Sequence, residues 1–140
     1  MGTPSATPSA TTTGGLIERP RLTTLLLDRF EHRVTSVIGA AGSGKTSMLT
    51  QAIANNRLDP RGRDVLVSIS RACNDPLQLV GRLATAANLP VDAEQSIDSI
   101  RDRILEWTWS QAPDDVCFVL DDVHLLTDQA ATRCLVDLIE

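Results

Sequence analysis

The sequence predicts an α/β fold of three layers, in which helices cover both faces of a parallel β-sheet. Three apolar segments have the length and the β-branched content of buried strands: 34–39, 65–70 and 116–120. Segments with the helical spacing of apolar residues separate these strands. Strands that are separated by helices pair in parallel through crossover connections.

The N-terminal half begins with a segment of unusual composition. Residues 1–15 contain only Met, Gly, Thr, Pro, Ser and Ala, so they have no charge and little apolar bulk. Such a segment cannot offset the entropy lost on ordering, and we predict a disordered tail followed by one domain over 16–140. Helices are expected over 21–31 and 45–56 on the basis of their apolar stripes: Leu22, Leu25, Leu26 and Phe30 in the first, and Met48, Leu49, Ala52 and Ile53 in the second.

The second half contains three helix-start signals. Asp75 and Pro76 suit the N-cap and the first position of a helix. Asp92 and Gln95 resemble a capping box, and Asp128 can cap a last helix. The apolar faces of these helices are expected to be Leu79, Val80, Leu83 and Ala87; Ile97, Ile100, Ile104 and Trp107; and Ala131, Cys134, Leu135, Leu138 and Ile139.

Composition excludes some classes of function. The net charge of −5 argues against direct contact with nucleic acid, because an acidic surface cannot neutralise phosphates. Cys73, Cys117 and Cys134 form no CxxC pair, and we expect reduced thiols in the core. No apolar run approaches the roughly 20 residues of a membrane span, and the N-terminus lacks a signal peptide. We therefore expect a cytoplasmic protein with no membrane partner.

The segment GAAGSGKT, residues 39–46, matches the phosphate-loop pattern G-x-x-x-x-G-K-[ST] between an expected strand and an expected helix. Glycines allow the loop to turn its N–H groups inward as an anion nest, and the following helix adds its positive dipole end. Lys45 supplies a positive charge for the outer phosphates, and the Thr46 hydroxyl is a hard ligand for Mg²⁺. The expected nucleotide-binding residues are Gly39, Ala40, Ala41, Gly42, Ser43, Gly44, Lys45, Thr46 and Ser47.

A carboxylate at the end of another strand is the partner that a phosphate loop requires. VCFVLDD supplies two, Asp121 and Asp122, whose side chains should point to opposite faces of the sheet. We assign Asp121 as a magnesium ligand, usually through water, alongside Thr46. Asp122 and Lys45 are the candidate catalytic residues, with Asp122 polarising the attacking water as a general base. The alternative is an ordinary strand end that happens to carry acids.

Three further residues are open to two interpretations. His124 follows the acidic pair and could sense the nucleotide, although a single His at this place is more often structural. Arg19 and Arg21 could approach an adenine, although such residues are more often solvated.

Four segments together resemble the nucleotide-binding domain of maltose-regulator-like transcriptional activators: ERPRL, VIGAAGSGKTSML, NDP and FVLDDVHLL. These are large ATP-binding regulators with a LuxR-type DNA-binding end, within the STAND class of P-loop ATPases. The resemblance covers about residues 18–140. It implies ATP and Mg²⁺ as cofactors, slow hydrolysis, and a nucleotide-controlled switch to an oligomeric form. DNA would be bound only by a C-terminal domain outside this chain.

The chain departs from that family in two respects. Ser43 stands where the family often has a glycine, and the sequence stops at Glu140, before the arginine-bearing sensor strand that lies between the phosphate-loop strand and the acidic strand. We therefore expect an incomplete, truncated domain of low stability and weak catalysis. Two other functions stay open: an AAA-type ATPase with rapid turnover, and a nucleotide-binding module that does not hydrolyse. ATP rather than GTP is favoured because the guanine-reading NKxD motif is absent.

Overall fold

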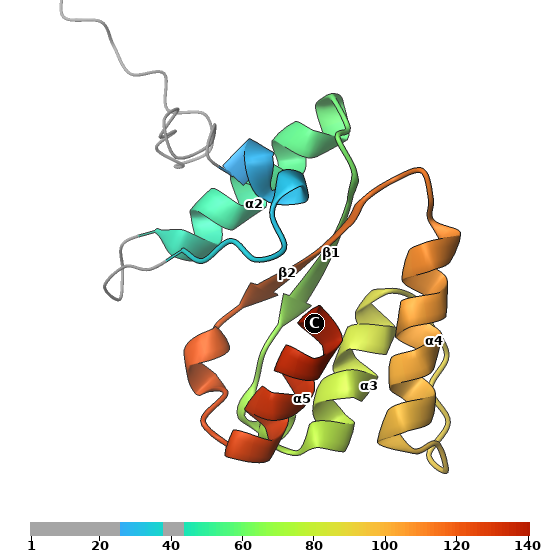
Figure 1. The fold of residues 1–140 in the computed structure, drawn as a ribbon. Coiled ribbons are helices and arrows are strands. Elements are labelled where there is room, and N and C mark those ends of the chain that lie inside the picture. The colour runs from blue at the N-terminus through green and yellow to red at the C-terminus, as the bar shows by residue number, and fades with distance from the viewer. Residues whose placement is uncertain (1–25, 38–43) are drawn as a thin grey trace, which may run out of the picture.

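The computed structural model describes residues 26–37 and 44–140 (Figure 1). The described residues form four α-helices and two strands, together with three short 3₁₀ helices (η) at strand and helix ends. In chain order the elements are η1 (Asp28–Glu31), α2 (Lys45–Leu58), β1 (Arg63–Ser68), η2 (Arg71–Asn74), α3 (Pro76–Ala86), α4 (Ile97–Ser110), β2 (Val116–Asp121), η3 (Val123–Leu125) and α5 (Gln129–Ile139).

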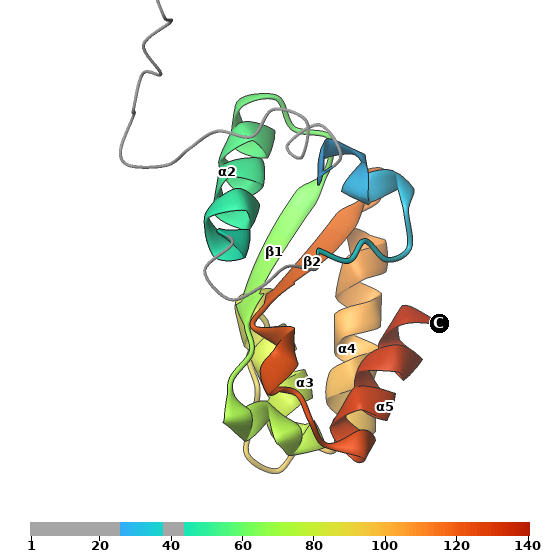
Figure 2. The ribbon, with the colours of Figure 1, turned by 90° about the vertical axis from the view of Figure 1, so that its left-hand side faces the viewer.

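The two strands pair in parallel, with Asp64 opposite Cys117 and Ser68 opposite Asp121. The connection between them runs through α3 and α4, which confirms the predicted crossover and the α/β class. Helices α3, α4 and α5 lie on one side of the sheet and α2 lies on the other (Figures 1 and 2). The predicted arrangement of helix, sheet and helix layers is therefore present.

The main core lies between the sheet and the layer of α3, α4 and α5. Alternate residues of β1 are buried there, which is the pattern expected when one strand face meets a helical layer. The largest fully buried side chains among the described residues are Val67, Cys73, Leu79, Val80 and Ile100. Their burial confirms the apolar faces predicted for α3 and α4.

The helix starts follow from local side-chain chemistry. The Asp75 carboxylate accepts a hydrogen bond from the backbone N–H of Leu77 at 3.0 Å, with Pro76 at the first helical position. Asp128 accepts in the same way from Ala131 at 3.0 Å. Both predicted caps are confirmed. The predicted capping box is wrong, because Ser96 caps α4 by accepting from Ser99. Asp92 and Gln95 bond to each other in the turn before it.

Some predicted element bounds also differ from the structure. The strand predicted over 65–70 is shifted two residues toward the N-terminus, because the ladder to β2 begins at Arg63. The helix predicted over 21–31 is helical from Leu26 onward, and residues 21–25 lie outside the described ranges. Ile139, predicted to face inward, is 37 % exposed at the last turn of α5.

The strand predicted over 34–39 is wrong in its described part. Residues 34–37 have no regular secondary structure, and Val34 is 57 % exposed. A strand requires a hydrogen-bonded neighbour, and the sheet of the described residues contains β1 and β2 alone. Residues 38–39, and the tail predicted over 1–15, lie outside the described ranges.

Candidate nucleotide-binding site

The start of α2 lies beside the C-terminal end of β2. Gly44 precedes the helix with φ of +83°, a conformation that disfavours any side chain, and its carbonyl accepts from the N–H of Met48 at 3.0 Å. Lys45, Thr46 and Ser47 form the first turn, where the backbone N–H groups point outward from the start of the helix. This end of α2 therefore has the donors and the dipole orientation that an anion needs. The predicted loop residues Gly39, Ala40, Ala41, Gly42 and Ser43 lie outside the described residues.

Thr46 and Asp121 are in contact although 75 residues separate them in the chain. The Thr46 hydroxyl donates a hydrogen bond to Asp121 Oδ1 at 3.3 Å. Asp121 is paired with Ser68 at the C-terminal end of the ladder between β1 and β2. The two residues assigned as magnesium ligands from the sequence are thus brought together by the fold.

The chemistry of these two side chains fits Mg²⁺. The atoms that would bind the ion, Thr46 Oγ1 and Asp121 Oδ1, are both oxygens. Mg²⁺ prefers six oxygen ligands in octahedral geometry, in which adjacent ligands lie roughly 3 Å apart. The 3.3 Å between Thr46 Oγ1 and Asp121 Oδ1 is close to that spacing. Among the residues described, His, Cys, Asp and Glu form no cluster of three or more that could hold a metal alone. A magnesium ion here would therefore take its other ligands from phosphate oxygens and water.

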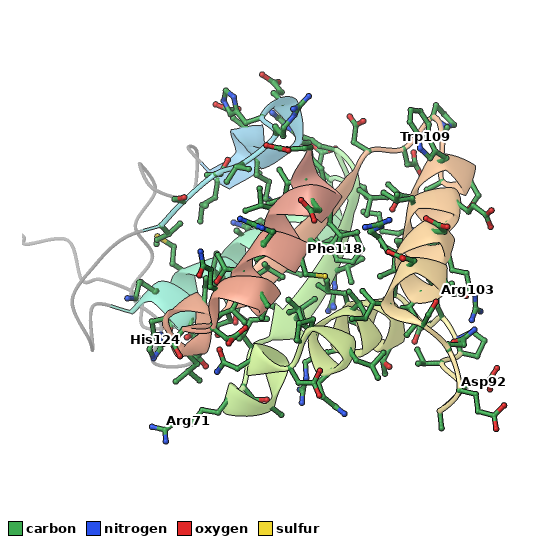
Figure 3. The ribbon with its side chains drawn as sticks, turned by 60° about the horizontal axis from the view of Figure 1, so that its bottom comes forward. Arg71, Asp92, Arg103, Trp109, Phe118 and His124 are labelled. Atoms are coloured by element: carbon green, nitrogen blue, oxygen red, sulfur yellow. The ribbon has the colours of Figure 1, made fainter. Side chains whose placement is uncertain are left out.

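The extended backbone of β2 ends at Asp121, and Asp122 has a different backbone conformation. It has φ of +60° and ψ of +32°, the left-handed region that Asp tolerates better than most residues, and it precedes η3. Its backbone N–H donates to Asp121 Oδ1 at 3.0 Å. Asp122 is exposed to solvent. His124 on η3 is exposed at the same end of the sheet, as is Arg71 on η2 (Figure 3).

A buried polar cluster lies on the α2 side of the sheet, and sequence reasoning missed it. Arg29 is 6 % exposed and donates to both carboxylate oxygens of Asp64, at 2.9 and 2.6 Å. Asn56 near the end of α2 donates to the same carboxylate at 2.9 Å and to the Gly62 carbonyl at 2.9 Å. These bonds fix the end of α2 that lies opposite the candidate site.

Two of the three cysteines have raised pKa values. Burial raises the pKa of the Cys117 thiol above its usual range, and the neighbouring Asp64 carboxylate raises it further. Partial burial likewise raises the pKa of Cys134. Cys73, Cys117 and Cys134 are all free, as predicted. The thiols of Cys117 and Cys134 are therefore poor nucleophiles near neutral pH.

A parallel α/β sheet, a helix that begins at Gly-Lys-Thr and an acidic strand end beside it together define the P-loop ATPase class. Within that class, the family model described as an AAA domain matches residues 28–140. The chain belongs to this AAA domain family. Comparisons with curated proteins and with solved structures gave no match. Among the helices of the described ranges, none has the length and apolar content needed to cross a bilayer.

Proposed function

We propose that the chain binds ATP with Mg²⁺ and hydrolyses it slowly, as the switch domain of a transcriptional regulator. The observation that carries the nucleotide part is the contact between Thr46 and Asp121, the side chains expected to face the metal. Membership of the AAA domain family supports nucleotide binding in general. The phosphates would lie against residues 39–47, at the start of α2.

Each site residue has a distinct task in this proposal. Lys45 balances the charge of the outer phosphates, while Thr46 and Asp121 would hold Mg²⁺. The bound ion would neutralise charge that develops on the phosphate oxygens. Asp122 orients the attacking water and accepts its proton, a role for which its exposed position after the strand is suitable.

The regulatory part of the proposal depends on the resemblance to maltose-regulator-like activators. It includes a cytoplasmic location, self-association of the full-length protein, and DNA binding by a domain outside this chain. The net charge of −5 supports the last point, because these residues would repel DNA phosphates. Two alternative functions can be distinguished from this proposal by kinetics. A DNA-remodelling ATPase would hydrolyse ATP rapidly, whereas a pure nucleotide-binding module would show no multiple-turnover release of phosphate.

The first experiment is equilibrium binding of a fluorescent ATP analogue, with Mg²⁺, to the wild-type chain and to Lys45→Ala. We expect Lys45→Ala to weaken binding by at least about tenfold, since a charge-assisted contact to phosphate is lost. Arg57→Ala is the matched control, because it removes the same charge from the exposed last turn of the same helix. Equal effects of the two variants, or no binding by the wild type, would refute the proposed phosphate site.

A competition experiment addresses the choice of base and the metal. Unlabelled ATP should displace the analogue at lower concentration than GTP does. Asp121→Asn should remove most of the gain in affinity that Mg²⁺ provides. Displacement by GTP at equal concentration would contradict the assignment of ATP.

A further inference from the structure

Asn74, the last residue of η2, uses both ends of its side-chain amide. Its Oδ1 accepts hydrogen bonds from the backbone N–H groups of Thr127 and Asp128, each at 2.8 Å. Its Nδ2 donates to the carbonyls of Leu125 at 3.0 Å and Arg71 at 3.1 Å. The Asn74 side chain therefore holds residues 125–128, at and after the end of η3, against η2, which follows β1.

These bonds close a short loop that contains the acidic pair. At its start, the Asp121 carbonyl accepts from the N–H of Ile69 at 2.9 Å. At its end, Leu125 and the residues after it are held by Asn74. Asp122 and His124 lie between these two fixed points. The backbone conformation of the loop therefore depends on hydrogen bonds to Ile69 and Asn74, which are outside the loop.

The same bonds reach the start of α5. Asp128, whose N–H is held by Asn74, caps α5 through its carboxylate. The position of η3 is thus defined by the rigid start of a helix on one side and by a strand end on the other. A loop held in this way can keep Asp122 in its left-handed conformation, which an unrestrained Asp would leave for a lower-energy one.

We propose that Asn74 is a positioning residue for the magnesium site, a role that rests on the proposed binding of Mg²⁺-nucleotide. Through residues 125–128 it fixes the backbone of Asp122, whose N–H donates to the Asp121 carboxylate at 3.0 Å. That hydrogen bond orients the carboxylate toward Thr46. Groups that orient a metal ligand through hydrogen bonds commonly change metal affinity by about 10–100-fold when removed.

The test is the affinity for a fluorescent ATP analogue measured in Mg²⁺ and again in EDTA. The ratio of the two affinities isolates the contribution of the metal. We expect Asn74→Ala to reduce this ratio about tenfold and to leave the affinity in EDTA unchanged, because the start of α2 is untouched. Ser96→Ala is the matched control, since it also removes a side-chain acceptor of a backbone N–H, but at the start of α4. It should leave both affinities unchanged.

Each outcome decides the proposal. An unchanged ratio for Asn74→Ala, or an equal loss in Mg²⁺ and in EDTA, overturns the positioning role while the proposed function stands. No binding by the wild type overturns both. If Asn74→Ala lacks the circular dichroism spectrum of the folded chain, Asn74→Asp is measured in its place. Asn74→Asp keeps the acceptor for Thr127 and Asp128 and loses the donors. We therefore expect its ratio of affinities in Mg²⁺ and in EDTA to lie between the wild-type ratio and a ratio of about one, at which Mg²⁺ adds no affinity. A ratio equal to that of the wild type overturns the positioning role.

Discussion

The buried pair of Arg29 and Asp64 offers the sharpest test of how α2 is held on the sheet. Both side chains are only 5 % exposed, and their closest atoms, Nη2 and Oδ2, are 2.6 Å apart. Asp64→Ala would leave the guanidinium of Arg29 buried without its carboxylate, and Asn56 would lose one of its bonds. We expect a large loss of stability, because a desolvated charge without its partner is strongly unfavourable.

The magnitude follows from the contacts. Asp64 accepts three hydrogen bonds, two from Arg29 and one from Asn56. Removing one member of a buried ion pair lowers the free energy of unfolding by about 3–5 kcal/mol. Replacing both members removes the unpaired charge, so Asp64→Ala combined with Arg29→Met should recover a large part of the loss. A double-mutant cycle should then show a coupling of about 2–3 kcal/mol.

Urea unfolding followed by far-UV circular dichroism measures these free energies. The matched control is Asp98→Ala, which removes the exposed pair between Asp98 and Arg101 at 3.1 Å and should change stability by less than about 1 kcal/mol. If Asp64→Ala is already unfolded without urea, the double variant should restore folding. A loss below about 1 kcal/mol for Asp64→Ala, or additive effects in the cycle, would refute the buried pair.

Three other predictions concern single residues. Gly44 and Gly81 both have open space where a Cβ would lie, but only Gly44 has a positive φ. Gly44→Ala should therefore lower the free energy of unfolding by about 1 kcal/mol, whereas Gly81→Ala, within α3, should raise it by about 0.5–1 kcal/mol. Changes of the same sign for the two variants in urea unfolding would contradict this prediction. Leu79→Ala should lower the same quantity by about 3 kcal/mol, because the side chain is fully buried, and a loss below about 1 kcal/mol would show that the core is packed differently. Since burial raises the pKa of Cys117, its alkylation by iodoacetamide near pH 8.5 should be slower in the folded chain than in urea, as read by peptide mapping. The folded state favours the protonated thiol, so Cys117 contributes stability below the pKa of the unfolded thiol, and this contribution is lost as pH rises toward the folded pKa; equal alkylation rates would refute the shift.

Features that depend on neighbouring residues could be predicted from the sequence. The caps at Asp75 and Asp128 bond to N–H groups two and three residues away, so their chemistry is visible in a short window. The same holds for the start of α2 and for the acidic end of β2. Even the contact of Thr46 with Asp121 could be anticipated, because parallel topology brings the ends of strands and the starts of helices to one edge.

Features that depend on distant partners could not be predicted in this way. Residues 34–37 have the composition of a strand, yet a strand forms only where another strand is available to pair with it. Arg29 and Asp64 are 35 residues apart, and each resembles a solvated surface charge when read alone. Asn74 stands beside a strong helix cap and gives no sign of partners more than 50 residues further along the chain.

Helix α2 contacts the candidate site at one end and the buried ion pair at the other. From Thr46 at the candidate site to Asn56 at the buried pair, the helix rises by about 15 Å. The exposed hydrogen bond between Thr46 and Asp121 contributes roughly 1 kcal/mol, whereas loss of Asp64 costs about 3–5 kcal/mol. The far end of the helix therefore sets its position on the sheet, and the Thr46–Asp121 bond can open with little effect on folding. A site that must exchange this bond for a metal ion and phosphate oxygens needs that separation, since the side chains of Thr46 and Asp121 can rotate apart while the backbone of α2 stays in place.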